Sequence, residues 1–296
     1  MRKTRILVGT AFAAAAALAL SGCNSGTPGA ETGASAGDAP MFEVASGVTI
    51  ADSPTFDRIT ADGKVIVGVK EDQPGLGYLD AATGERSGFD IDIARWIAAS
   101  LGYDENKIEY KSIPSANREQ AIVNGDIDYY VGTYSITDKR KELIDFAGPY
   151  FISGQGLLVA ASDDTITGID TLADKTVCSA TGSTSIQRIK DEHPEAKTTE
   201  FDTYSQCVEQ LKTGQVDAVT TDQAILIGYA AQDPSELKVV GDTFSEERYS
   251  VGIQKGDTAF VDFVNTMLTD GGTTWTAIFD KNLGASGIEV SQPQVD

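Results

Sequence analysis

Two stretches of the sequence share one layout, and this repeat restricts the possible folds more than any other feature. Residues 118–133 (REQAIVNGDIDYYVGT) and 206–221 (QCVEQLKTGQVDAVTT) each consist of an apolar-periodic helix, a Gly turn, an Asp, an apolar strand and a threonine. Because each copy is a complete helix–strand unit, the repeat predicts two similar α/β lobes rather than one continuous sheet.

Each repeat leads into polar residues that suit the capture of a small molecule. After the first strand come the hydroxyl residues Thr133 and Ser135 and then Arg140, whereas the second copy runs directly into Asp222. Side chains at the ends of strands in α/β sheets often bind small ligands, and arginine is well suited to a carboxylate. A cation from one lobe that faces an anion from the other would suit a zwitterion.

Length and charge limit the possible partners. The chain has 296 residues, enough for two modest lobes, and a formal net charge of −21. This acidity argues against nucleic acid and against an anionic membrane surface as partners.

The N-terminal segment has the pattern of an export signal. Residues 1–22 begin with basic residues and continue with an Ala-rich apolar core too short to form a stable membrane span. The sequence Leu-Ser-Gly-Cys that ends at Cys23 resembles a bacterial lipobox, so Cys23 is expected to carry lipid and to hold the protein at the extracytoplasmic face of the membrane. The alternative is an ordinary secretory cleavage with an incidental cysteine.

Residues 23–60 are predicted to form a flexible tether, since the part up to residue 40 is rich in Gly, Ser, Ala and Thr and lacks an apolar period. Export also bears on the two remaining cysteines. Outside the cytoplasm, the pair Cys178 and Cys207 fits a disulfide better than a metal site or a nucleophile.

The stretch 88–101 (GFDIDIARWIAASL) predicts a helix with Asp90 and Asp92 at its N-terminal end. The helix dipole favours carboxylates there, so a structural role is expected rather than a catalytic pair. This stretch resembles the signature of the family 3 bacterial extracellular solute-binding proteins. The resemblance extends from about residue 64 to residue 283 and includes Gly-Ser-Thr at 182–184, Asp222 and the segment 270–284.

The resemblance implies the fold. A family member is a two-lobed α/β clamshell of the type II periplasmic-binding-protein class. Lobe 1 would comprise residues 61–151 and 249–296, and lobe 2 would comprise residues 152–248. Two short crossings, at 151–156 and 247–249, would form a hinge that closes on the ligand.

The resemblance also implies a ligand clamp for an amino acid. Arg140 would bind the α-carboxylate, with Thr133 and Ser135 presenting a carbonyl and a hydroxyl to the ligand's α-groups. From the other lobe, Thr184 would add its backbone N–H at a helix N-terminus, and Asp222 would neutralise the α-ammonium.

Specificity is expected to come from Lys70 and Arg118. In relatives that bind basic amino acids, an acid stands at the position of Lys70, and residues 115–118 (SANR) resemble the glutamate/aspartate-binding branch. Two cations favour glutamate, with aspartate, glutamine or another polar amino acid as alternatives. The loop at Gln73 lacks the aromatic residue that family members often place there, which leaves ring stacking on the ligand in doubt.

A receptor is therefore favoured over an enzyme. A few relatives are dehydratases, but the sole histidine, His193, lies in a polar turn, and the sequence holds no familiar catalytic motif. No catalytic residue, metal or cofactor is expected. A sensor would normally carry a membrane-spanning segment and a signalling domain, which the sequence does not predict. The expected partners are an amino acid and the permease of an ABC importer, with the receptor acting as a monomer.

Overall fold

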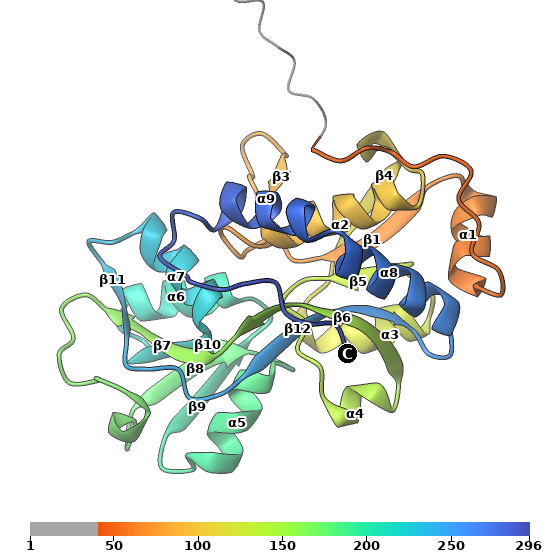
Figure 1. Cartoon of the computed structure of the whole chain (residues 1–296). Coiled ribbons are helices and arrows are strands. Elements are labelled where there is room, and N and C mark those ends of the chain that lie inside the picture. Colours follow the sequence, from red (N-terminus) through yellow and green to blue (C-terminus); the bar gives the residue numbers. More distant parts are fainter. Residues whose placement is uncertain (1–40) are drawn as a thin grey trace, which may run out of the picture. The chain divides into compact units, whose positions relative to one another are not determined.

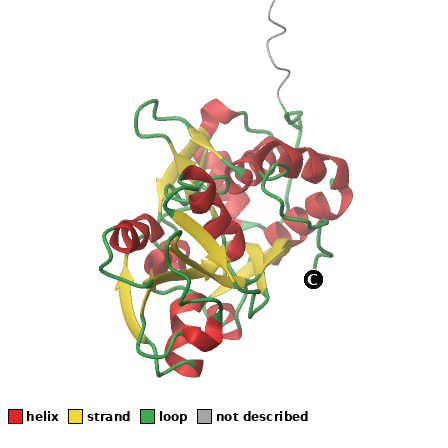
Figure 2. Ribbon diagram, turned by 90° about the vertical axis from the view of Figure 1, so that its left-hand side faces the viewer, coloured by secondary structure: helices red, strands yellow, loops and turns green. Residues whose placement is uncertain are grey.

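Two five-stranded sheets account for the two lobes that the repeat predicts (Figures 1 and 2). The computed structural model describes residues 41–296; the predicted leader and Cys23 lie outside this range. The strand order is β4-β1-β5-β12-β6 in the first sheet and β11-β7-β10-β8-β9 in the second. The strands are β1 (Val65–Val69), β2 (Tyr78–Leu79), β3 (Arg86–Ser87), β4 (Ile108–Ser112), β5 (Tyr129–Val131), β6 (Ile144–Ser153), β7 (Gln155–Ala160), β8 (Thr176–Ala180), β9 (Lys197–Phe201), β10 (Ala218–Asp222), β11 (Leu237–Val240) and β12 (Glu247–Gln254).

The two sheets repeat one topology. In the first, β1 lies between β4 and β5 and is parallel to both; in the second, β8 lies between β9 and β10 and is parallel to both. An antiparallel strand then follows in each, β12 beside β5 and β7 beside β10. The strands β5 and β10 end the two sequence repeats, so they occupy equivalent places in the two lobes.

Helices connect and cover the strands, and α2, α8 and α9 lie together over the first sheet (Figure 1). The α-helices are α1 (Pro54–Asp62), α2 (Phe89–Ser100), α3 (Arg118–Val123), α4 (Asp138–Lys141), α5 (Thr184–Glu192), α6 (Tyr204–Lys212), α7 (Gln223–Gln232), α8 (Thr258–Asp270) and α9 (Gly272–Asn282). Short 3-10 turns occupy Glu105–Lys107 (η1), Ser115–Asn117 (η2) and Ile169–Thr171 (η3). Between residues 41 and 296, the helices fall short of the length and apolarity needed to cross a membrane.

The predicted tether ends earlier than the sequence suggested. Residues 54–60 lie in helix α1 instead of a flexible segment, and the packed residue Ile59 is fully buried. The Ser53 hydroxyl accepts the N–H of Phe56 as a helix cap, and it donates to the buried carboxylate of Asp257. Ser-Pro at a helix start is a capping signal, and the prediction of a tether to residue 60 overlooked it.

The strands that pass between the lobes are held by aromatic side chains. β6 and β12 pair over most of their length, from Ser153 opposite Glu247 to Ile144 opposite Gln254. Phe151 on β6 stacks on Tyr249 of β12, with ring centroids 5.6 Å apart. Phe89 of α2 packs against Phe151 at 5.3 Å. The hinge strands are therefore anchored on the helical layer of the first lobe.

The predicted disulfide is present in the second lobe. Cys178 on β8 is bonded to Cys207 on α6, with their Cα atoms 5.5 Å apart and a sequence separation of 29. In the chain-entropy model a loop of this size contributes about 3.5 kcal/mol to the free energy of unfolding. The bond ties the helix of the second repeat to its sheet.

Candidate functional site

The seven residues predicted to bind a ligand all lie near the boundary between the two sheets. They come from the ends of β1 and β5, from α3 and α4, and, in the second lobe, from α5 and β10. Most of them are nearly inaccessible to solvent. The buried members are Lys70, Arg118, Thr133, Ser135, Arg140 and Asp222.

Thr133 has a backbone conformation that needs support from its neighbours. Its φ is +46°, which is unusual for a β-branched residue. The Asp90 carboxylate accepts the Thr133 N–H at 3.0 Å, and the Gln73 side chain lies 3.1 Å from its hydroxyl. Burial raises the pKa of Asp90 to about 6, although a hydrogen bond from Tyr150 opposes this effect. Asp90 therefore holds the loop of the site, a role beyond the helix-end position predicted for it.

Arg140 is oriented by protein acceptors. Its Nε donates to Glu119 at 3.0 Å, and its two terminal nitrogens donate to the carbonyl oxygens of Ser135 at 2.7 Å and of Gly182 at 3.1 Å. A guanidinium carries five N–H donors, so two remain for a carboxylate. The ring of Tyr134 lies under the guanidinium at 4.9 Å and fixes its plane.

Lys70 and Arg118 are buried cations that form no ion pair with an acidic side chain of the described residues. Lys70 Nζ donates to the Ser115 hydroxyl at 2.7 Å, and Arg118 donates to main-chain carbonyls and stacks on Tyr134 at 4.3 Å. Within residues 41–296, no carboxylate oxygen lies within 4.0 Å of either charged group. Burial, reinforced by Arg118, lowers the pKa of Lys70 to about 7.

Asp222 presents the opposite charge from the second lobe. Its Oδ2 accepts the Tyr249 hydroxyl at 2.7 Å, whereas its buried Oδ1 has no hydrogen-bond partner among the described residues. Burial, together with the nearby charge of Glu247, raises the pKa of Asp222 to about 7. A buried carboxylate oxygen without a donor is costly, so it suits a cationic ligand group.

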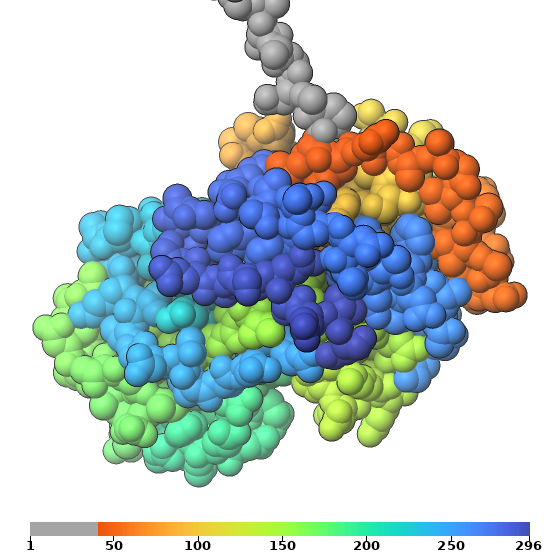
Figure 3. Space-filling model, in the orientation of Figure 1, coloured from red at the N-terminus to blue at the C-terminus, as the bar shows by residue number. Residues whose placement is uncertain are grey.

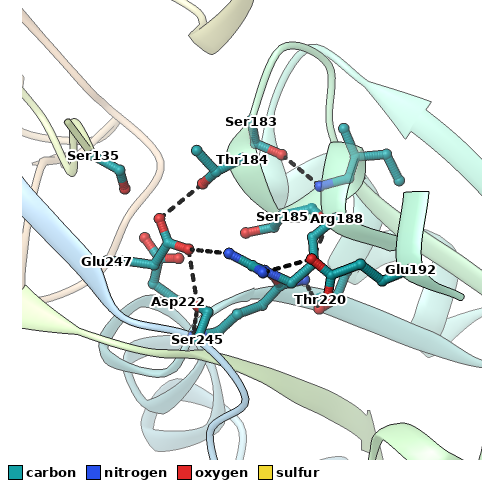
Figure 4. A network of polar contacts seen from close by, with 12 residues as sticks. Ser135, Ser183, Thr184, Ser185, Arg188, Glu192, Thr220, Asp222, Ser245 and Glu247 are labelled. Atoms are coloured by element: carbon teal, nitrogen blue, oxygen red, sulfur yellow. Dashed lines mark hydrogen bonds and ion pairs between the residues drawn. The ribbon is translucent and has the colours of Figure 1, made fainter. Parts of the chain in front are cut away.

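Thr184 occupies the first position of α5, as the sequence predicted. The Ser183 hydroxyl caps this helix by accepting the N–H of Ile186, and the Thr184 hydroxyl donates to Glu247 at 3.0 Å (Figure 4). The Ser183 cap occupies the N–H of Ile186, so the N–H groups of Thr184 and Ser185 in the first turn remain available to an anion.

The two lobes touch beside these residues. Arg118 and Arg140 both reach the carbonyl oxygen of Gly182 across the boundary, and the Tyr229 hydroxyl donates to the main-chain oxygen of Asp72. A hollow of about 500 Å³ opens between α4 and α5 (Figure 3). Arg140 and Thr184 both line it, so it leads toward the site.

Sequence reasoning missed several residues that support the site. The most informative are Asp72 and Tyr229, which join the lobes, and Glu247 and Tyr249 on β12. Glu247 and Tyr249 are separated by two positions and so share a face of the strand, a pattern that was visible in the sequence. The pairing of Asp72 with Tyr229 spans 157 residues, and nothing local signals it.

Comparison with known proteins agrees with this geometry. Residues 65–285 match the bacterial extracellular solute-binding proteins of family 3. Over 241 residues the chain is 42% identical to the glutamate-binding protein GluB of Corynebacterium efficiens, covering 76% of this chain and 82% of the relative. It is 41% identical over 239 residues to a glutamine-binding protein of Geobacillus stearothermophilus, covering 80% and 87%. A solved structure of an ancestral arginine-binding protein bound to arginine superposes with a TM-score of 0.69 at 35% identity, covering 75% and 99%.

The chain therefore belongs to family 3 of the bacterial extracellular solute-binding proteins. Its two lobes form the α/β clamshell of the type II periplasmic-binding-protein class, as predicted from the sequence.

The contact at Gly182 predicts how closure can be blocked. Gly182 has φ +76°, and a Cβ there would lie 2.7 Å from the Cα of Ala116 in the other lobe. We expect Gly182→Ala to resist closure, so that its radius of gyration by small-angle X-ray scattering, with a mixture of the common amino acids added, exceeds that of the wild type.

Gly214→Ala is the matched control. Gly214 has φ +71° in the same lobe, and a Cβ there would meet nothing within 4 Å. Both variants bear the same cost of a positive φ, about 1–2 kcal/mol, but only Gly182→Ala adds the clash between the lobes. Equal radii of gyration for the two variants would contradict the inference that the Gly182–Ala116 contact forms when the lobes close.

Proposed function

We propose that this protein is an amino-acid receptor of an ABC importer and that its ligand is L-glutamate. The observation that carries the proposal is a set of buried charged groups that form no ion pair within 4.0 Å among residues 41–296: Lys70 and Arg118 on the first lobe and Asp222 on the second. Unpaired buried charges are destabilising, so the site is complementary to a ligand that brings the missing opposites.

The three ionised groups of glutamate match three parts of this site. The α-carboxylate would take the two free N–H donors of Arg140 and the N–H groups at the start of α5. The α-ammonium would donate to the unpaired Oδ1 of Asp222 and to acceptors of the Thr133–Ser135 segment. The side-chain carboxylate would then extend toward Lys70 and Arg118.

Lys70 and Arg118 favour a ligand with a side-chain carboxylate over one with a side-chain amide. Glutamine would leave Lys70 and Arg118 without a negative partner, whereas glutamate neutralises them. The glutamate-binding relative from Corynebacterium supports this choice, and the glutamine-binding relative from Geobacillus, of nearly equal identity, makes glutamine the alternative to test.

The other proposed properties follow from the family and from the predicted leader. We infer that the receptor is monomeric, that it is anchored by lipid on Cys23 at the extracytoplasmic face of the membrane, and that it delivers its ligand to the permease of the importer. Catalysis is not part of the proposal. His193 at the end of α5 lies near Glu195, 3.3 Å away, and is not among the residues that contact the site.

Isothermal titration against the twenty amino acids tests the proposal. The chain from Asn24 onward should first be unfolded and refolded to strip carried-over ligand. Micromolar or tighter binding of glutamate, about −8 kcal/mol or stronger, is the expected result. A clear preference for glutamine or a basic amino acid would keep the receptor and reject glutamate. Heat from none of the twenty would reject the amino-acid receptor.

Substitution of Lys70 separates acid from amide recognition. Lys70→Met removes one cation from the side-chain end of the proposed site, so we expect glutamate affinity to fall by about tenfold or more and glutamine affinity to change much less. Lys197→Met, which alters an exposed lysine on β9, is the control and should leave both affinities unchanged. A parallel loss for glutamate and glutamine would contradict the role of Lys70.

The pKa values of Lys70 and Asp222 predict that glutamate binding is strongest near pH 7. Both pKa values are about 7 without ligand. Bound glutamate should raise the pKa of Lys70, so protons are taken up on the alkaline side and affinity falls as the pH rises. The ammonium should lower the pKa of Asp222, so protons are released on the acidic side and affinity falls as the pH drops.

Calorimetry in two buffers of different ionisation enthalpy measures these protons directly. We expect net proton uptake at about pH 8 and net release at about pH 6, because the two groups titrate around the midpoint between these values. Binding without proton exchange at either pH would contradict the assignment of both residues to the ligand site.

A further inference from the structure

Two residues of the hinge strand β12 reach the part of the site that the second lobe contributes. Glu247 and Tyr249 lie two positions apart, so both side chains project from one face of the strand. Tyr249 donates its hydroxyl to Asp222 at 2.7 Å. Glu247 accepts the hydroxyl of Thr184 at 3.0 Å (Figure 4). One strand therefore contacts both ligand-facing elements of this lobe, β10 and α5.

The Glu247 carboxylate is enclosed by donors. It is 2% exposed, and in addition to Thr184 it accepts the Ser245 hydroxyl at 2.8 Å and lies 3.7 Å from the Arg188 guanidinium. Arg188 follows Thr184 by four residues, so one face of α5 supplies both a hydroxyl and a cation to the same carboxylate (Figure 4). The positive end of the helix dipole adds to this attraction.

We propose that Glu247 is a positioning residue of the amino-acid site: it fixes the first turn of α5 to the strand that also fixes Asp222 through Tyr249. This inference rests on the proposed function, because it assigns the first turn of α5 and Asp222 to the two α-groups of the ligand. As the hinge strands bend, the anion-binding turn and the ammonium-binding carboxylate keep their relative placement, since both are tied to β12.

Because Glu247 lies near Asp222, its charge should have a measurable effect on the pKa of Asp222. After burial, the charge of Glu247 is the main influence that raises the pKa of Asp222. Tyr249 on β12, Arg118 of α3 and Arg140 of α4 act in the opposite direction. Removal of the Glu247 charge should therefore lower the pKa of Asp222, whereas loss of a purely structural contact should leave it unchanged.

A double-mutant cycle on Glu247 and Thr184 tests the positioning. Glu247→Gln removes the charge, and Thr184→Val removes the hydroxyl while it keeps the backbone N–H. We expect each single variant to weaken glutamate binding by about tenfold and the double variant to be little weaker than the more affected single variant, because both act on the same charge-assisted contact. Fully additive losses overturn the proposal.

Glu192→Gln is the matched control for the charge. Glu192 pairs with the opposite side of Arg188 at 2.8 Å but is half exposed. It should change glutamate affinity by less than about twofold. If Glu247→Gln does not fold, as judged by its thermal unfolding, Ser245→Ala takes its place in the cycle with Thr184→Val, since it removes another donor from the same carboxylate.

A second readout does not depend on the ligand. Carbon-13 NMR of ligand-free protein follows the titration of the Asp222 carboxyl, which we expect to shift to lower pH in Glu247→Gln and to stay unchanged in Glu192→Gln. An unchanged titration in Glu247→Gln overturns the proposal. Should the wild type bind no amino acid, the proposed function fails, and this titration alone decides the placement of Glu247 beside Asp222.

Discussion

Uncompensated charge in a buried place is the constraint on which this molecule depends. Lys70 and Arg118 on one side and Asp222 on the other are withdrawn from water, and among residues 41–296 they contact hydroxyls, carbonyls and aromatic rings and form no ion pair within 4.0 Å. The cost of this arrangement appears in the pKa values, since that of Lys70 falls to about 7 and that of Asp222 rises to about 7. At pH 7 the side chains of Lys70 and Asp222 are therefore close to losing their charges, and a ligand of opposite charge would favour their charged forms.

A rigid frame holds these charges in place. Asp90 maintains the unusual backbone of Thr133, and the aromatic cluster of Phe89, Phe151 and Tyr249 anchors the hinge strands on α2. Tyr249 connects this aromatic cluster to the site, because its ring packs in the cluster while its hydroxyl donates to Asp222. Movement of the hinge is thereby linked mechanically to the carboxylate that faces the cleft.

The sequence was sufficient for the features that local patterns encode. The repeat of helix, Gly turn and strand predicted two lobes, and the sheets show the same strand order around β1 and β8. The family and the disulfide were predicted as well. Asp222 lies at the end of β10, and Arg140 lies in α4, the helix that follows β5.

Other features depended on contacts between distant segments. The prediction of a tether up to residue 60 was wrong because it overlooked the Ser-Pro helix start, and the helix that forms there is also held by Asp257, some two hundred residues away. The positive φ of Thr133 is supported by Asp90 of α2 and by Gln73 of the loop after β1. Glu247 was expected only as part of the second crossing between the lobes, and only the fold shows that its carboxylate contacts Thr184 and Arg188 of α5.

The different origins of the charged groups have a stereochemical consequence. Lys70, Arg118, Arg140 and Asp222 approach the site from four separate elements, so in the proposed complex three of the four substituents on the ligand's Cα have a fixed destination. The mirror image of the ligand can reach the same three destinations only if its Cα–H points to the opposite face of the site. A site enclosed between two lobes would therefore distinguish the hand of its ligand through charge placement and steric enclosure together.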